Sequence, residues 1–177
     1  MAPQLRIIGG DWRGRKLPTL DVEELRPTTD RIRETLFNWL MHDIQGAACL
    51  DAFAGSGALG LEALSRGATH ATFCDTSLPL IAQLKANISK LNCADKCRVL
   101  RANFLATSFP QKFDLVFLDP PFGQNLIPKC LDKIKTLLND RGLIYVETEQ
   151  DFELDTDFEI IKSKQAGNVK YSLLQAI

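Results

Sequence analysis

The chain has 177 residues, of which 45% are hydrophobic and 24% charged, and its formal net charge is -1. This length and apolar content predict one domain with a sizeable core, and the near-neutral charge excludes binding of nucleic acid through overall positive charge, so such a partner needs a local basic patch. No apolar run approaches the roughly 20 residues of a membrane-spanning helix, and the first six residues lack the layout of a signal peptide, so we expect a cytoplasmic protein without a membrane partner.

Residues 5–17 are basic and carry the signals of a small hairpin. They contain four cations against a single acid, Asp11, and Gly9, Gly10 and Gly14 supply turn positions. The cations are Arg6, Arg13, Arg15 and Lys16. This segment is the local basic patch that the composition as a whole does not provide.

A helix is predicted next, with Ile32, Leu36 and Leu40 on its apolar face. Pro27 keeps the residue before it extended, and Thr28, Thr29 or Asp30 is suited to cap the helix. Three further cations lie in or just before it, namely Arg26, Arg31 and Arg33.

Strands and helices then alternate. Strands are predicted at 48–52, 70–74, 97–100, 113–118 and 142–146. The helices between them include one ending at Gly67, one capped by Ser77 with Pro79 in its first turn, and one with Ile127, Cys130, Leu131, Ile134 and Leu138 on one face. Segments 158–162 and 169–173 flank a Gly167-Asn168 turn and predict a hairpin. We therefore expect an α/β, Rossmann-like fold, with a seven-stranded, mostly parallel sheet, a C-terminal antiparallel hairpin and helices on both faces.

Acids close three of the predicted strands: Asp51, Asp75 and Asp119. In parallel sheets ligands bind at the carboxyl ends of the strands, near the switch in strand order. Three acids at that edge indicate a binding site.

Gly55-Ser56-Gly57-Ala58-Leu59-Gly60 fits the GxGxxG pattern of a dinucleotide fold, and Asp75 follows about twenty residues later. However, Asp51 would repel a pyrophosphate and is suited to a cationic amino-acid group. Glycines allow an adenosyl group to approach the backbone as closely as a phosphate, and Asp75 is suited to both ribose hydroxyls. The loop alone leaves a methyl donor and NAD as alternatives.

The turn Asp119-Pro120-Pro121-Phe122 favours the methyl donor. Two prolines remove two N–H donors, so the turn presents only acceptors, which suits a bound NH2 group. Phe122 offers a face on which a base can stack, and these four residues are the predicted catalytic centre.

Together these motifs resemble the class I amino-methyltransferases and, more narrowly, the ribosomal RNA small subunit methyltransferase D family. The most specific stretches are residues 6–17, 26–40 and 50–66. The resemblance implies S-adenosylmethionine as cofactor and the N2 amino group of a guanine in 16S rRNA as target. It implies that the cofactor is bound by Asp51, Phe53, Gly55, Gly57, Asp75, Asn103 and Phe104.

The resemblance also gives the basic residues a role. Arg6, Arg13, Arg15 and Lys16 are predicted to contact rRNA phosphates, and Arg26, Arg31 and Arg33 to extend that surface or help close the cofactor pocket. An assembled or assembling small subunit is the favoured substrate over free rRNA, and nothing in the sequence demands more than a monomer. We expect one domain over residues 1–177, with the hairpin and helix in 1–45 and the cofactor-binding core in 46–177.

Three alternatives stay open at this point. An adenine-N6 enzyme acting on DNA or RNA, or a protein amino-methyltransferase, would use the same turn, while an NAD-dependent oxidoreductase would leave the turn without a role. A catalytically silent RNA-binding protein would keep only the fold. We expect no metal site, because the five cysteines form no CxxC pair and the two histidines lie at no ligand-like spacing.

Overall fold

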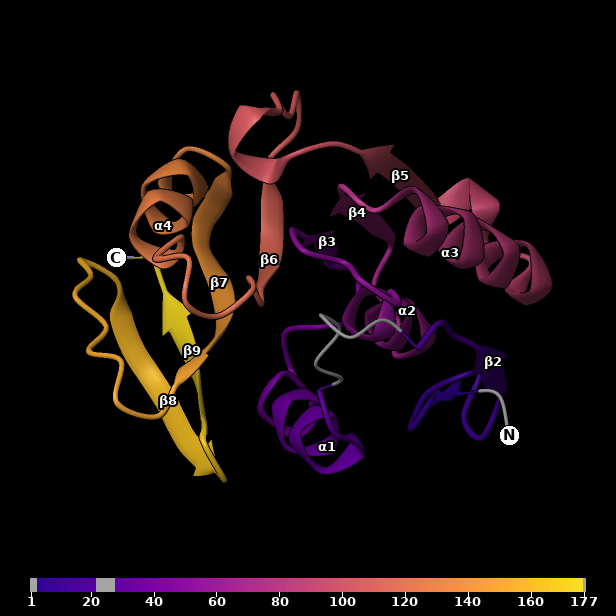
Figure 1. Ribbon diagram of the computed structural model, residues 1–177, viewed down its shortest axis with the longest axis horizontal. Coiled ribbons are helices and arrows are strands. Elements are labelled where there is room, and N and C mark those ends of the chain that lie inside the picture. Colours follow the sequence, from indigo (N-terminus) through magenta and orange to yellow (C-terminus); the bar gives the residue numbers. More distant parts are fainter. Residues whose placement is uncertain (1–2, 22–27, 177) are drawn as a thin grey trace.

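The computed structural model describes residues 3–21 and 28–176, and its centre is a seven-stranded sheet (Figure 1). The strand order is β5-β4-β3-β6-β7-β9-β8, in which the first five strands run parallel and β9 pairs antiparallel with both β7 and β8. The bounds are β3 Ala48–Asp51, β4 His70–Asp75, β5 Cys97–Arg101, β6 Phe113–Leu118, β7 Leu138–Glu149, β8 Glu159–Ala166 and β9 Val169–Gln175. The predicted fold class is confirmed, including the C-terminal hairpin.

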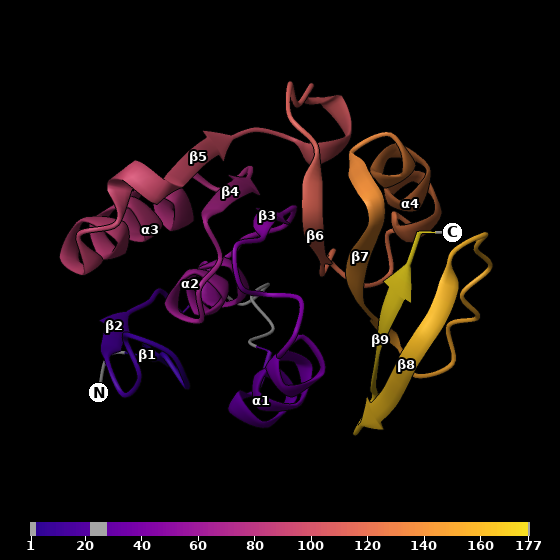
Figure 2. The same cartoon turned by 180° about the vertical axis from the view of Figure 1, so that it is seen from behind.

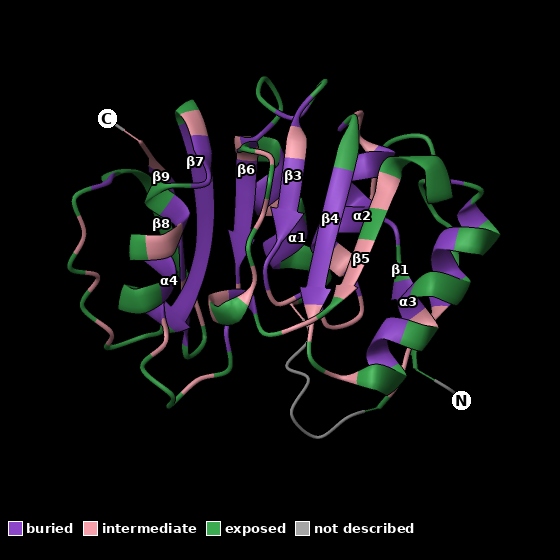
Figure 3. Cartoon of the chain, turned by 90° about the horizontal axis from the view of Figure 1, so that it is seen from above, coloured by how far each residue is buried: buried purple, intermediate pink, exposed green. Residues whose placement is uncertain are grey.

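Helices cover both faces of this sheet (Figures 1 and 2). The helices are α1 Asp30–Trp39, α2 Ala58–Ser65, α3 Leu78–Leu91 and α4 Ile127–Lys135, with short 3-10 turns at Ala94–Lys96 and Phe104–Ala106. The first three helices share one apolar core with one face of the strands, and α4 shares a second core with the other face. Figure 3 shows the central strands buried along most of their length, as expected for a parallel sheet that is covered twice.

Capping signals predicted the starts of α1 and α3 correctly. The Thr29 hydroxyl accepts a hydrogen bond from the Ile32 N–H at the start of α1, and the Ser77 hydroxyl accepts one from the Leu80 N–H at the start of α3. These bonds satisfy backbone donors that a helix leaves unpaired in its first turn. α2 is followed by Gly67, whose φ is +107°.

One helix was predicted to be longer than it is. α4 ends at Lys135, and Leu138, which was assigned to its apolar face, begins β7 instead. The Phe113 N–H donates to the Leu137 carbonyl at 2.8 Å, and Phe113 pairs with Leu138 in the sheet. Leu138 is buried in the same core as the α4 residues, so apolar spacing alone could not separate helix from strand at this point.

The basic segment forms the predicted hairpin, with β1 Gln4–Arg6 antiparallel to β2 Lys16–Pro18. It makes a separate two-stranded sheet beside α2 and α3 (Figure 2). Its buried side, Leu5, Ile7 and Leu17, joins the core shared by α1, α2 and α3. No helix among the described residues is long and apolar enough to cross a membrane.

Candidate functional site

A cavity of about 390 Å³ lies at the carboxyl ends of β3 and β6. It is the place where three parts of the chain meet: the hairpin, the start of α1 and the loop after β3. Five predicted site residues line it, namely Asp51, Phe53, Gly55, Asp119 and Arg33. The structure therefore joins the predicted donor loop and the predicted reactive acid in one space.

The glycine loop brings backbone close to neighbouring elements. Gly55 and Gly57 have φ values of +53° and +80°, which favour glycine, and a Cβ on Gly57 would lie 2.4 Å from Leu84 Cδ1. A Cβ on Gly60 would lie 2.3 Å from the Phe73 ring, so α2 packs directly on β4. The loop turns tightly from β3 into α2, and part of it lines the cavity.

Asp51 is the most deeply buried acid of the cavity, at 3% exposure. Its Oδ2 accepts a hydrogen bond from the Gly60 N–H at 3.1 Å. Burial raises the pKa of Asp51 from 3.8 to about 7, although the Gly60 bond opposes the shift, and the Asp75 charge adds to it. A carboxylate in this environment gains stability from a bound cation.

This pKa shift predicts a pH dependence of stability. In the unfolded chain Asp51 loses its proton near its ordinary pKa of 3.8, but in the folded protein it holds the proton up to about 7. Its stabilising contribution is therefore complete below the lower value and is lost as pH rises through the upper one. We expect the Tm of the ligand-free wild type to fall more between about pH 5 and pH 8 than that of Asp51→Asn, which cannot titrate at this position. Parallel Tm curves for the two proteins would contradict the shift.

Asp75 acts first on the loop itself. Its Oδ2 accepts from the Gly55 N–H at 2.8 Å and its Oδ1 from the Ser77 N–H at 2.9 Å. Each carboxylate oxygen has a second lone pair, so this arrangement leaves Asp75 able to accept hydroxyl groups as well.

The Asn103-Phe104 pair differs from expectation at its second residue. The Asn103 side chain is exposed and accepts from the Leu105 N–H at 2.9 Å. Phe104 is only 2% exposed and packs its ring against Phe53 and Phe109, so its side chain is a core residue and presents no free face to an adenine. An apolar ring at a strand end gains more from burial in the α4 core than from exposure at the site.

The Asp-Pro-Pro-Phe turn is divided between two hollows. Asp119 lines the large cavity, whereas Pro120, Pro121 and Phe122 line an adjoining hollow of about 170 Å³ with Phe152. Asp119 and Phe122 therefore face different hollows. A base stacked on Phe122 would have its edge directed toward Asp119.

Glu147 is a second acid beside this turn, and the sequence analysis missed it. It is 4% exposed, and its Oε1 accepts from the Thr28 and Tyr145 hydroxyls, both at 2.7 Å. The Thr28 Oγ1 is also 3.5 Å from Asp119 Oδ2, so one hydroxyl links the two acids. Burial and the Glu147 charge raise the pKa of Tyr145. The sequence did offer a signal for Glu147, because this acid lies in the apolar run that follows Gly142.

The predicted basic residues divide into exposed and buried groups. Arg13, Arg15, Lys16 and Arg31 are exposed, and Arg6 is half exposed in an ion pair with Asp30 at 3.2 Å. Arg26 lies outside the described residues.

Arg33 does not extend the basic surface as predicted. It is only 2% exposed, because α1 turns it inward onto Asp30 and Glu62, which lie 2.6 Å and 3.6 Å from its guanidinium. Its position on the cavity wall agrees instead with the other predicted role, closure of the pocket.

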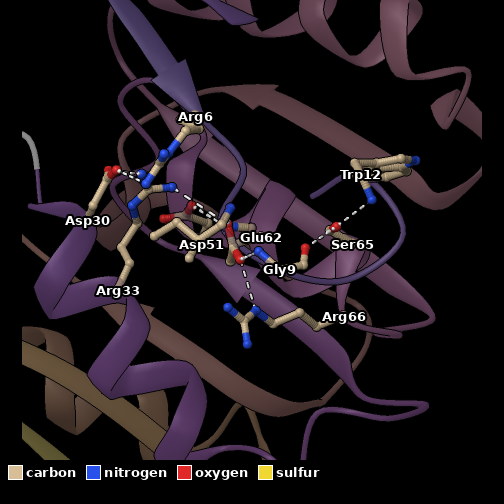
Figure 4. Close-up of polar contacts among 11 residues, drawn as sticks. Arg6, Gly9, Trp12, Asp30, Arg33, Asp51, Glu62, Ser65 and Arg66 are labelled. Carbon is tan, nitrogen blue, oxygen red and sulfur yellow. Dashed lines mark hydrogen bonds and ion pairs between the residues drawn. The ribbon is translucent and has the colours of Figure 1, made fainter. Parts of the chain in front are cut away.

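Glu62 of α2 connects this pocket to the hairpin (Figure 4). It is fully buried and accepts from the Ile8 N–H at 2.9 Å, the Gly9 N–H at 2.8 Å and the Arg66 Nε at 2.8 Å. The hairpin is therefore attached to the helix that follows the glycine loop, and Glu62 was not recognised from the sequence. In the described parts of the chain, no group of three or more His, Cys, Asp or Glu side chains is arranged to hold a metal ion.

Comparison with known proteins identifies relatives of this chain. The family described as "Conserved hypothetical protein 95" matches residues 5–175. Ribosomal RNA small subunit methyltransferase D of Escherichia coli is 49% identical over 97% of this chain and 90% of its own, and that of Haemophilus influenzae is 47% identical over 97% and 94%. The solved structure of the Escherichia coli protein yhhF, which carries a methyltransferase description, aligns with a TM-score of 0.87 at 47% identity over 98% of both chains.

Proposed function

The chain belongs to the "Conserved hypothetical protein 95" family, together with ribosomal RNA small subunit methyltransferase D, and on this basis we propose that it methylates the N2 amino group of a guanine in 16S rRNA. The methyl donor of this reaction is S-adenosylmethionine. The observation that carries the proposal is the single cavity in which the glycine loop and Asp51 meet Asp119.

The residues of the cavity fit the donor. S-adenosylmethionine, when bound, supplies a methyl group on a positively charged sulfur together with an ammonium group. Asp51 is a buried carboxylate that lines the cavity and is therefore suited to the ammonium. Gly55, on the cavity wall, would admit the adenosyl part close to the backbone. Gly57 and Asp75 do not line the cavity; Gly57 would shape the loop, and Asp75, which accepts from the Gly55 N–H, would accept the ribose hydroxyls at its edge. Phe53 would give the apolar wall, and Asn103 would lie at the adenine end.

Asp119 to Phe122 would hold the target amine. Asp119 and the turn carbonyls accept its two N–H groups, because the prolines contribute no competing donor. Hydrogen bonds to both protons favour a pyramidal nitrogen with its lone pair directed toward the methyl group. The same fixed acceptors stabilise the positive charge that develops on nitrogen. In-line positioning of the amine and the methyl group supplies much of the remaining rate enhancement.

The guanine target and the 16S rRNA come from the family resemblance. Adenine N6 also presents an NH2 group, so the turn alone does not choose between the bases. An NAD-dependent oxidoreductase is not favoured, since it leaves Asp119 without a role and both relatives carry a methyltransferase name. We place the enzyme in the cytoplasm as a monomeric single domain over residues 1–177, acting on an assembled or assembling small subunit.

The exposed cations of the hairpin are the proposed rRNA contact. We expect the triple variant Arg13→Ala, Arg15→Ala, Lys16→Ala to bind 16S rRNA more weakly and with a flatter salt dependence, because each phosphate contact releases a counterion. Electrophoretic mobility shift across a salt series measures both effects. Lys162→Ala with Lys164→Ala on the distant, exposed strand β8 is the control. A salt slope equal to that of the wild type would contradict the proposed surface.

The function itself is tested by transfer of a labelled methyl group to unmethylated 16S rRNA, naked and within small subunits, followed by nucleoside analysis. The expected product is N2-methylguanosine. N6-methyladenosine would assign the enzyme to the adenine class, and binding of NAD without binding of S-adenosylmethionine would overturn the proposed activity.

A further inference from the structure

Arg33 is a buried cation whose hydrogen bonds are incomplete. Its side chain is 2% exposed, yet the guanidinium Nε and Nη1 have no hydrogen-bond partner. Only Nη2 makes a short contact, 2.6 Å from Asp30 Oδ1. Buried polar groups are almost always paired, because leaving one unpaired forfeits its hydration without compensation. These two N–H groups are therefore able to donate to a further acceptor.

The neighbouring acid does not need Arg33. Glu62 Oε2 is 3.6 Å from the Arg33 Nη1, which is beyond hydrogen-bond distance, while both Glu62 oxygens already accept from closer donors. Those donors are the backbone of Ile8 and Gly9 and the side chain of Arg66. The Glu62 cluster is complete without the free edge of the Arg33 guanidinium.

Arg33 also lines the cavity. Arg33 and Asp51 both line the cavity, one with a buried cation and the other with a buried carboxylate, and Figure 4 shows the Arg33 side chain pointing from α1 toward Asp51 and Glu62. Two opposite charges on one wall match a zwitterion, in which an ammonium and a carboxylate are separated by one carbon. An α-amino acid group has this charge pattern.

We propose that Arg33 binds the α-carboxylate of the methionine part of the methyl donor, while Asp51 faces its ammonium. This inference rests on the proposed function, since it assigns one residue to one group of the same donor. Hydrogen bonds between a guanidinium and a carboxylate are among the stronger ones in proteins. Arg33 would then discriminate against adenosyl compounds that lack the carboxylate.

The test compares S-adenosylmethionine with decarboxylated S-adenosylmethionine, which keeps the ammonium and the sulfonium. Kd values are measured by isothermal titration calorimetry for the wild type, Arg33→Met and, as a control that removes an exposed cation, Lys85→Met of α3. We expect the wild type and Lys85→Met to prefer the intact donor by about 10- to 100-fold, and Arg33→Met to bind both compounds with similar Kd.

The outcomes separate the two proposals. A wild type that binds neither compound would overturn the proposed function together with this inference. Retention of the full preference by Arg33→Met would overturn the inference alone. If Arg33→Met does not fold, as judged by circular dichroism, Arg33→Lys carries the test: its preference should be reduced, because Lys keeps the charge but loses the planar fork. An unchanged preference in Arg33→Lys would then overturn the inference.

Discussion

Replacement of Asp119 by alanine is expected to lower the rate of methyl transfer on the order of 10²- to 10³-fold, the usual cost of removing one fixed group that stabilises developing charge. Asp119 directly follows β6, and its carboxylate lines the same cavity as the glycine loop. Its loss would remove an acceptor for the target amine and leave the positive charge on nitrogen without its nearest negative partner. Affinity for the donor should change much less, because Asp51 and the loop remain.

Single-turnover methyl transfer to small subunits, with calorimetric titration of the donor, separates these two effects. Asp155→Ala is the matched control, since Asp155 is an exposed acid that does not line the cavity. Asp119→Asn, which keeps one carbonyl acceptor, should retain more activity than alanine. If Asp119→Ala lost donor affinity in proportion to its rate, Asp119 would be a donor-binding residue and its role toward the amine would be wrong.

Replacement of Glu62 by alanine should be the most destabilising single change in the network of Figure 4, at about 3–5 kcal/mol. The carboxylate is fully buried and accepts from two backbone N–H groups of the hairpin and from Arg66. Its removal leaves the Ile8 and Gly9 N–H groups and the Arg66 Nε without this acceptor, while Arg33 keeps its ion pair with Asp30. The hairpin should lose its attachment to α2 as a result.

Equilibrium unfolding in urea measures this loss, and amide hydrogen exchange in residues 5–17 reports on the hairpin separately. Glu34→Ala is the control, because Glu34 is exposed on α1 and such surface changes usually stay within about 0.5 kcal/mol. Glu62→Gln should lose less than alanine, since its carbonyl oxygen still accepts one backbone bond. A Glu62→Ala protein as stable as Glu34→Ala would show that the hairpin is held by its apolar side alone.

The order of strands and helices was readable from the sequence because each element carries its own local signal. Strand 113–118 is a continuous apolar run, and the Ser77 cap is a side-chain interaction over three residues. The end of α4 was not readable, because Leu138 is buried in the same core whether it continues a helix or starts a strand. Pairing with Phe113, which is distant in sequence, decided in favour of the strand.

The candidate site divides in the same way. Asp51, Asp75 and Asp119 could be placed at one edge from the sequence, because each follows a parallel strand and the carboxyl ends of such strands meet. The role of Glu62 could not, since a charged residue in a helix gives no sign of its burial. The apolar run around Glu147 was a signal that the sequence analysis missed, and the sequence left two roles open for Arg33. Only packing shows that α1 turns Arg33 inward while its neighbour Arg31 stays exposed.

Asp119-Pro120-Pro121-Phe122 illustrates both kinds of information. The sequence by itself determined its chemistry, an acceptor-only turn with an aromatic ring after a buried strand, because proline and aspartate have those properties wherever they stand. Only the tertiary structure decided that Asp119 and Phe122 line different hollows, that Thr28 links Glu147 to Asp119, and that a buried arginine shares the cavity. These facts depend on contacts between segments up to 119 residues apart, and such contacts exist only once the sheet has formed.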